Sequence, residues 1–349
     1  MLNVDLELFQ NLLDVGSVSS DEEMVMDVFR KYLQKYTSDV NFDQMGNTWA
    51  TNPVMGDFHV LLSAHADEIG MQITEICENG LLKMRRVGGV NTLYVIGQLM
   101  QVKTNKGMVS GVVVAKSSCK DNNVVPNMEE CFLDIDAANK DEANAMVSLG
   151  DFVTFAPNFA SCRNVLTSKS IDNRSGIFVI LQVFSHLKNQ LQHVNLTVAA
   201  TTQEEIGLRG MAVLSQKVHP NICINIDVTD AREFDKNNLP LLGSGPVLYK
   251  NADSNPMLRK LMQSVALKHN IPWQQALGRN ITGGTDTSRI QLFSPNTAVL
   301  DLAIPCKYMH SHYEKCSIKD VESCIFLLET FLKNLDASIA KGDRLDFNY

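Results

Sequence analysis

The segment Val194–Gly210 reads VNLTVAATTQEEIGLRG, and its character changes half-way along. Residues Val194–Thr201 form an apolar run that predicts a buried strand. Two adjacent carboxylates, Glu204 and Glu205, follow where that run ends, with glycines close behind. Acidic pairs usually face water on helices, and that is the simplest interpretation. If the two glutamates share a chemical task, the rest of the chain must supply partners for them.

The overall composition predicts a globular protein of the cytoplasm. The chain has 349 residues, 45% of them hydrophobic, with a mean hydropathy of −0.06, so it can hold two domains or one large domain with an insertion. Its apolar runs are too short to span a bilayer, and its start lacks the features of a signal peptide. A net charge of −8 disfavours nucleic acid and anionic membranes as partners. Eight scattered cysteines without a C-x-x-C pair predict reduced thiols rather than a zinc ribbon.

Three stretches of the chain differ in pattern. Residues 1–69 begin with helical spacing and end in the apolar run FHVLLSAHAD. Residues 70–163 break into short strand-like runs separated by turn signals such as Asn79–Gly80, a strong hairpin signal. Residues 164–349 alternate strands and helices. We therefore expect an α/β domain with a mainly parallel central sheet flanked by helices, and a β-rich domain inserted into it.

Hydrophobic periodicity predicts the positions of the main elements. Ser20 and Glu23 form a candidate capping box at the start of an N-terminal helix. The elements expected after residue 164 are helices over Ser175–Leu187, Pro256–Lys268 and Ile318–Ala340 and strands over Val194–Thr201, Ile222–Ile226, Ile271–Gln275 and Thr297–Ile304.

Four of the predicted strands end in residues that can bind metal ions. These are His65 and Asp67 after HVLLSA, Glu204 and Glu205 after LTVAATT, Asp227 after ICINI, and His310 after TAVLDLAIP. Asp172 directly precedes a predicted helix, where an anion suits the helix dipole. A single residue of this kind is most often a structural cap. Because ligands of open α/β sheets bind beyond the carboxyl ends of the strands, all of these residues together predict one shared site.

Two histidines and three carboxylates form a mixed nitrogen and oxygen donor set. Without thiolates such a set is unlike a structural zinc site and suits catalytic Zn²⁺, Mn²⁺ or Co²⁺. Asp67 can accept the remaining imidazole N–H of His65 and fix the ring. If either Glu204 or Glu205 binds a metal, its neighbour stands where a general base would take a proton from a metal-activated water.

Six motifs occur in the order typical of one enzyme family: AHADEIG, IDNRSG, TTQEEIGLRG, INIDVTD, GGTDTSRI and IPCKYMHSHYE. In these motifs the chain resembles the cytosolic tetrahedral (TET) aminopeptidases, which include the glutamyl aminopeptidases. The segments DQMGN (43–47) and LGD (149–151) extend the resemblance over nearly the whole chain. It implies a zinc-peptidase-like catalytic domain with a dinuclear metal site, divided into residues 1–69 and 164–349, and an inserted PDZ-like domain over residues 70–163.

The resemblance also implies a role for each site residue. His65, Asp172 and Asp227 would bind one divalent metal ion, and Asp172, Glu205 and His310 the second, with Asp172 bridging. Zn²⁺ is the metal expected first, with Co²⁺ or Mn²⁺ as alternatives. Glu204 would be the general base, Asp67 would orient His65, and the Asp172–Asn173 peptide bond would be cis.

The motif GGTDT has two possible interpretations. It could be a phosphate-binding loop, but it lacks the lysine of a P-loop. In the family this loop lies beside the substrate, which makes Thr285 and Asp286 candidate pocket residues. Two further residues near the site have structural interpretations: His312 as a side chain beside the site or facing solvent, and Cys306 as a packed small side chain.

The resemblance predicts hydrolysis of N-terminal residues from short peptides. It also predicts that dimers built through residues 70–163 form a hollow tetrahedral dodecamer. The inserted region departs from the family pattern at Asp136, Val90–Tyr94 and Lys116–Glu130, so assembly and specificity remain open. The alternative is a dinuclear-metal amidase, deacylase or carboxypeptidase acting on another small substrate, and dependence on a free amine would separate the two. A glycosidase is disfavoured because adjacent glutamates cannot flank a sugar ring. A metal-free peptide-binding scaffold is disfavoured by the complete ligand set.

Overall fold

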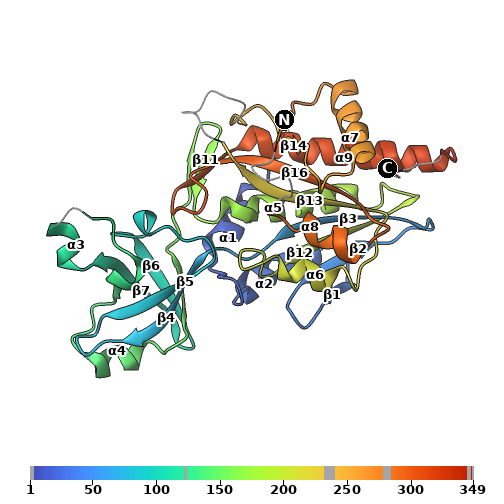
Figure 1. Ribbon diagram of the computed structural model, residues 1–349. Helices are drawn as coiled ribbons and strands as arrows, with labels where there is room; N and C mark the ends of the chain where they lie inside the picture. The colour runs from blue at the N-terminus through green and yellow to red at the C-terminus, as the bar shows by residue number, and fades with distance from the viewer. Residues whose placement is uncertain (1–3, 122–123, 232–239, 278–283, 344–346, 348–349) are drawn as a thin grey trace.

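The computed structural model describes residues 4–121, 124–231, 240–277, 284–343 and 347. The chain forms two bodies that lie side by side (Figure 1). The larger body contains an 11-stranded sheet with helices on its faces, and the smaller is a closed barrel of six strands. Each body has its own cluster of buried apolar side chains.

The large sheet is mixed, which corrects the expectation of a mainly parallel sheet. Only its centre, in the order β12–β3–β13–β16, and the pair β14–β15 are parallel. The antiparallel pairs β1–β2, β10–β11 and β16–β17 are each joined by a short connection, such as residues 43–47 between β1 and β2, which cannot make a parallel crossover. Along the sheet the strands are β1 (Val40–Phe42), β2 (Thr48–Asn52), β12 (Val194–Thr201), β3 (Phe58–His65), β13 (Ile222–Asp230), β16 (Ala298–Lys307), β17 (Glu314–Ser317), β11 (Val165–Ser168) and β10 (Ala160–Cys162), with β14 (Val247–Tyr249) and β15 (Gln274–Ala276) beside β16.

Both faces of the parallel centre are buried. Along β3, Val60 and Leu62 face the main apolar cluster, whereas Leu61 faces a second cluster on the opposite side. The first face is covered by α1 (Leu6–Asp14), α2 (Glu23–Leu33), α5 (Ile171–Leu187) and α9 (Ile318–Ala340), with α7 (Pro256–Lys268) against α9. The opposite face is covered by α6 (Arg209–Leu214) and α8 (Thr287–Phe293). Burial on both faces explains why these strands are almost continuously apolar.

Most predicted elements are present, and several bounds differ. The helices α7 and α9 and the strand β12 have the predicted bounds. The strand expected over Ile271–Gln275 is the shorter β15, Gln274–Ala276. The predicted capping box is wrong: Ser20 has a left-handed backbone with φ of 78°, and α2 begins after Glu22 without a side-chain cap.

The barrel is assembled from consecutive short strands. Around it the order is β4 (Gly70–Ile76), β5 (Leu82–Val87), β8 (Cys131–Asp134), β7 (Gly107–Ala115), β6 (Leu99–Thr104) and β9 (Phe152–Phe155). The predicted hairpin turn at Asn79–Gly80 joins β4 to β5, and Gly80 has the positive φ of 83° that such a turn favours. The short helices η1 (Thr92–Tyr94), α3 (Ser117–Asp121), η2 (Met128–Glu130) and α4 (Lys140–Met146) connect the strands.

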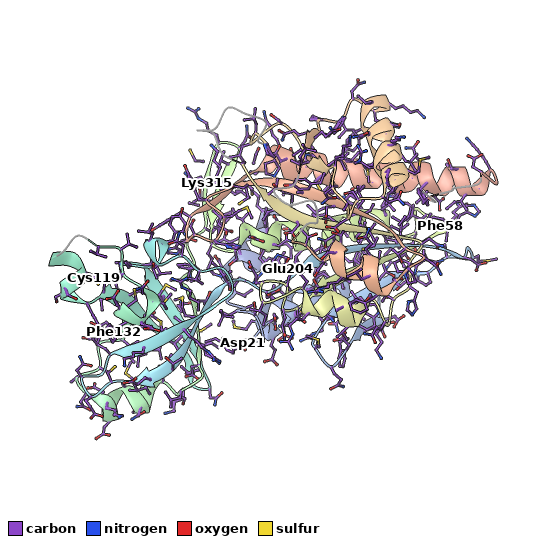
Figure 2. The ribbon with its side chains drawn as sticks, in the orientation of Figure 1. Asp21, Phe58, Cys119, Phe132, Glu204 and Lys315 are labelled. Carbon is purple, nitrogen blue, oxygen red and sulfur yellow. The ribbon has the colours of Figure 1, made fainter. Side chains whose placement is uncertain are left out.

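The carboxyl ends of the parallel strands face the barrel. In Figure 2, Phe58 at the start of β3 lies far from the barrel, and Glu204, which follows β12, lies between it and the barrel. The chain leaves β3 at His65 and enters the first barrel strand five residues later. Among the helices of the described residues, none is long and apolar enough to cross a membrane.

Candidate dinuclear metal centre

The predicted metal-binding residues meet at the carboxyl edge of the parallel strands. His65 is the last residue of β3, and Glu204 and Glu205 lie in the loop after β12. Asp227 lies within β13, which continues past the predicted end to Asp230. The two remaining residues are Asp172 in the first turn of α5 and His310 between β16 and β17.

The carboxyl group of Asp172 lies between the two histidines. Its Oδ1 is 3.1 Å from Nε2 of His65, and its Oδ2 is 3.5 Å from Nε2 of His310. Each oxygen therefore faces a different imidazole, which is the arrangement that a bridging ligand requires. Asp172 and Asn173 interrupt the helical geometry of α5, and the peptide bond between them is cis, as the resemblance implied.

Each of the other ligand candidates lies near one of the two histidines. Nε2 of His65 is 3.6 Å from Oδ1 of Asp227 and 4.0 Å from Oε2 of Glu204. Nε2 of His310 is 3.3 Å from Oε1 of Glu205. Two sets of ligand atoms lie within 4.8 Å of one another: His65, Glu204 and Asp227, and His65, Asp172 and Glu205. Glu204 therefore lies as close to the centre as the predicted ligands do.

Four carboxyl groups converge here with little compensating charge. Within the described part of the chain, the cationic groups that pair with them are the two imidazoles. Burial raises the pKa of Glu204 well above its usual range, and Asp227 and Glu205 raise it further. Burial alone would lower the pKa of His65, but the carboxylates of Glu204 and Asp172 raise it well above its ordinary value. Such a cluster is stable as an ionised group only with cations bound.

The donor set fits divalent metal ions. Buried imidazole and carboxylate groups, without cysteine in either set, match the ligands of catalytic zinc and similar ions. Two divalent cations would balance the four converging carboxylates of Asp172, Glu204, Glu205 and Asp227.

Asp67 supports the site in a way that sequence reasoning only partly anticipated. Nδ1 of His65 is 3.1 Å from the backbone oxygen of Asp67 and 3.4 Å from its Oδ1. The Asp67 carboxylate also accepts the backbone N–H groups of Glu204 and Glu205, at 3.0 and 3.1 Å, and the hydroxyl of Ser19 at 2.6 Å. It therefore holds the paired glutamates as well as the imidazole.

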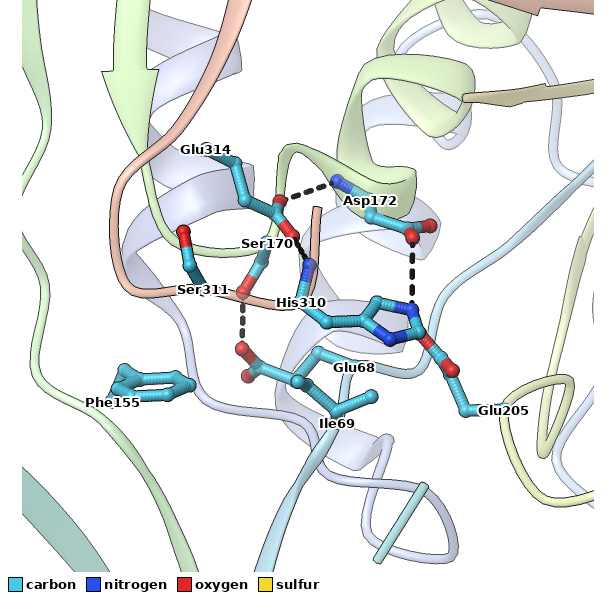
Figure 3. Close-up of a pocket in the computed structure, with 9 residues that line it drawn as sticks. All are labelled: Glu68, Ile69, Phe155, Ser170, Asp172, Glu205, His310, Ser311 and Glu314. Atoms are coloured by element: carbon cyan, nitrogen blue, oxygen red, sulfur yellow. Dashed lines mark hydrogen bonds and ion pairs between the residues drawn. The ribbon is translucent and has the colours of Figure 1, made fainter. Parts of the chain in front are cut away.

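Glu314 was missed by sequence reasoning although it ends the motif IPCKYMHSHYE. Its Oε2 accepts the backbone N–H of Asp172 at 2.9 Å, and its Oε1 accepts that of His310 at 2.7 Å (Figure 3). One buried carboxylate thus fixes the main chain of two ligand candidates from different elements. The only signal in the sequence is an acid four residues after His310, and that spacing alone does not indicate this contact.

The predicted pocket residues Thr285 and Asp286 are engaged in internal hydrogen bonds. Thr285 donates its hydroxyl to Oδ1 of Asp301 at 2.8 Å, and Asp286 accepts the hydroxyl of Thr201 at 2.5 Å. Burial raises the pKa of Asp286 to about 7. Gly283, the first residue of GGTDT, lies outside the described residues. A role for Thr285 and Asp286 in substrate binding remains a prediction.

The two side chains with structural interpretations, His312 and Cys306, are both buried. The His312 ring contacts the barrel: its Nε2 is 2.9 Å from the backbone oxygen of Ala156, and its ring stacks on Phe155. Burial raises the pKa of the Cys306 thiol well above its usual range, which makes it a poor nucleophile.

A mixed α/β sheet with histidines and carboxylates clustered at its carboxyl edge is typical of metal-dependent hydrolases. Residues 46–327 match the M42 glutamyl aminopeptidase family, and the chain belongs to that family. The lysyl aminopeptidase of Pyrococcus furiosus is 31% identical over 342 residues, 95% of this chain and 98% of that protein. The chain is therefore a metal-dependent aminopeptidase.

Solved structures show the same fold. A TET aminopeptidase from a marine sediment Thaumarchaeota archaeon superposes with a TM-score of 0.90 and 28% identity, over 97% of this chain and 99% of that one. The TET1 peptidase of Pyrococcus horikoshii gives a TM-score of 0.85 and 28% identity, over 94% of this chain and 98% of that one. That peptidase can assemble into a tetrahedron or a large octahedral shell.

Proposed function

We propose that the site is a dinuclear centre that removes N-terminal residues from short peptides. His65, Asp172 and Asp227 hold one metal ion, and Asp172, Glu205 and His310 hold the other, with Zn²⁺ as the first candidate and Co²⁺ or Mn²⁺ as alternatives. The observation that carries this assignment is the carboxyl group of Asp172, which directs one oxygen to His65 and the other to His310. When bound, the two ions would lower the pKa of a water molecule and polarise the scissile carbonyl.

Glu204 is the proposed general base. Its carboxylate takes a proton from the attacking water and passes it to the leaving amine, which is the usual task of a general acid–base residue. Burial and neighbouring carboxylates raise the pKa of Glu204, and two bound divalent cations would lower it, which favours the ionised carboxylate that a general base requires. Asp67 holds both Glu204 and the ring of His65, so it acts by positioning rather than by bond making.

Substrate class is tested by dependence on a free N-terminal amine. Metal-free protein, with Zn²⁺, Co²⁺ or Mn²⁺ added back separately, is assayed with aminoacyl p-nitroanilides, their N-acetylated forms and C-terminally amidated peptides. An aminopeptidase cleaves the free-amine substrates and leaves the acetylated ones intact. Faster cleavage of the acetylated substrates would favour a deacylase, and failure on C-terminally amidated peptides alone would favour a carboxypeptidase. The most activating ion identifies the metal that the site prefers.

We also propose that residues 70–163 form an inserted, PDZ-like oligomerisation domain between the two parts of the catalytic domain, residues 1–69 and 164–349, and that the enzyme is a cytoplasmic dodecamer. On the barrel, the register partners Leu99 and Val112 of β6 and β7 are 49% and 39% exposed, and Leu93 and Tyr94 of the short helix η1, which precedes β6, are 59% and 41% exposed. An apolar patch of this kind is typical of a surface that is covered in an assembly. Active sites enclosed in a hollow assembly would accept only short, unfolded peptides.

A further inference from the structure

A turn of the barrel contacts a metal-ligand candidate of the large body. Gly88 and Gly89 directly follow β5, and the backbone oxygen of Gly89 is 3.2 Å from Nδ1 of His310. A carbonyl oxygen can only accept a hydrogen bond, so Nδ1 carries the proton. Nε2 is then the nitrogen that a metal ion would bind, and it faces Asp172 and Glu205.

The closeness of this contact depends on both glycines. A Cβ atom on Gly89 would lie 2.6 Å from Nδ1 and 2.8 Å from Cε1 of His310, which is too close for any side chain. Gly88 has a φ of 76°, and a Cβ atom there would lie 2.8 Å from the side chain of Ile69 and 3.3 Å from Cβ of Glu205. The turn is therefore packed against Glu205 and His310, the two proposed ligands of the second metal ion that the first ion does not share.

A second contact holds the same loop to the barrel two residues further on. Nε2 of His312 is 2.9 Å from the backbone oxygen of Ala156, and its Nδ1 is 2.7 Å from Oε1 of Gln98. The ring also stacks on Phe155, with centroids 5.1 Å apart. Phe155 lies at the edge of the pocket formed by Asp172, Glu205 and His310 (Figure 3). The loop that carries His310 is thus fixed to the barrel at two points.

We propose that the Gly88–Gly89 turn of the inserted barrel is a positioning element for the second metal ion, and that it acts through the imidazole of His310. The barrel then forms one wall of the metal centre in addition to any part it has in assembly. This inference rests on the ligand roles proposed above for Glu205 and His310. The first ion, held by His65, Asp172 and Asp227, has no ligand in contact with this turn and should be affected much less.

The variant Gly89→Ala tests this inference in the full-length protein. Zn²⁺ is titrated into metal-free protein by calorimetry against a competing chelator, and Co²⁺ is titrated with visible absorption as the readout. Loss of a group that orients a metal-binding histidine typically weakens metal affinity about 10- to 100-fold. We expect that loss for the second ion only, with a changed Co²⁺ spectrum at that site. Far-ultraviolet circular dichroism should match the unmodified chain.

The matched control is Gly107→Ala. It adds the same methyl group to another glycine of the barrel, in the β6–β7 hairpin, where the new Cβ would meet no atom of the described residues within 4 Å. This hairpin is not among the barrel segments that contact the His310 loop, so both metal affinities should be retained. An equal loss in Gly107→Ala and Gly89→Ala would contradict the inference, and so would unchanged affinity in Gly89→Ala.

A second variant, His312→Ala, covers the case in which Gly89→Ala does not fold. It removes one of the two points that fix the loop to the barrel, without any steric conflict, so the second ion should again bind more weakly and the first should not. Unchanged binding of the second ion in His312→Ala would then overturn the inference. If the unmodified chain binds fewer than two Zn²⁺ ions, the proposed dinuclear centre itself is wrong, and the inference fails with it.

Discussion

Two buried carboxylates that accept backbone N–H groups, Asp67 and Glu314, support the site from behind the ligand candidates. Asp67 fixes the main chain of Glu204 and Glu205, and Glu314 fixes that of Asp172 and His310. Hydrogen bonds to charged acceptors are stronger than neutral ones, contributing about 1.5–3 kcal/mol each. The site therefore depends on groups that would touch neither metal nor substrate.

Among the elements, three segments are joined by a buried ion cluster directly behind the metal centre. Glu68 lies between β3 and β4, Lys169 lies between β11 and α5, and Ser17 lies between α1 and α2. Nζ of Lys169 is 2.9 Å from Oε2 of Glu68, and Oε1 of Glu68 accepts the backbone N–H of Ser17 at 2.7 Å. Lys169 also donates to the backbone oxygen of Val15 at 3.1 Å. The cluster holds the turns that carry Asp67 and Asp172.

Replacing Lys169 by methionine should destabilise the protein strongly. It removes one partner of a fully buried pair and leaves Glu68 with the longer contact to Arg174, at 3.7 Å, so the cost should lie near the lower end of the about 3–5 kcal/mol that is typical of breaking a buried pair. The control is Lys140→Met, because the pair of Lys140 with Glu78 is solvent-exposed. Denaturant unfolding of the metal-free proteins measures the free energy of unfolding of both variants. A Lys169→Met protein as stable as the Lys140→Met protein would show that the cluster does not hold these segments.

The sequence alone was sufficient for elements with strong local signals. Hydrophobic periodicity predicted α7 and α9 with the bounds that the structure shows. The antiparallel edges of the sheet were not all predictable in this way, because pairing partners such as β11 and β17 lie far apart in the sequence and meet only in the folded structure. The prediction of a capping box was wrong because Oε1 of Glu22 accepts the backbone N–H of Ser20, and the Ser20 side chain does not cap α2. A pattern of residue types does not indicate which side chain bonds to the backbone.

For the site, the residues with metal-binding chemistry were predictable, and the residues that support them were not. His65, Asp172 and Glu205 belong to residue types that bind metals, and each follows or precedes a recognisable element. Glu314 supports the site through main-chain N–H groups that every residue has, so no pattern of side chains points to it. The Gly89 contact likewise joins positions 221 residues apart, and only the folded structure brings them together.

At the scale of the whole molecule, the barrel has two surfaces with different surroundings. One face contacts the metal-centre loop through Gly89, Gln98 and Ala156. The apolar patch that includes Leu99 and Val112 is exposed in the single chain. Assembly through that patch would leave the metal centre intact, so the two properties should be separable by mutation.

The variant Leu99→Asp should disrupt assembly and leave metal binding unchanged. An unpaired charge in a buried interface is costly to desolvate, so the assembled species should shift to smaller ones. Light scattering is the measurement, and a dodecamer of 38.8 kDa chains would have a mass of about 466 kDa. The control is Leu267→Asp, on an exposed position of α7 that is 67% accessible. A fully active monomer of the unmodified chain at micromolar concentration would rule out the assembly proposal.

The central claim is that Glu204 and Glu205 have different roles, and a paired substitution tests it most directly. Glu205→Gln replaces an anionic ligand with a neutral amide and should lower occupancy of the second metal site. Glu204→Gln keeps almost the same shape but cannot accept a proton, so metal content should stay near two ions per chain. Turnover should then fall by at least the roughly 10²- to 10⁴-fold that general-base catalysis provides, with a much smaller change in substrate affinity.

The measurement is metal content by mass spectrometry, made on the same preparations as kcat. We predict full metal content with very low kcat for Glu204→Gln, and reduced metal content for Glu205→Gln. Loss of metal in Glu204→Gln with retention in Glu205→Gln would reverse the two roles. If both variants stay active, the catalytic site lies elsewhere.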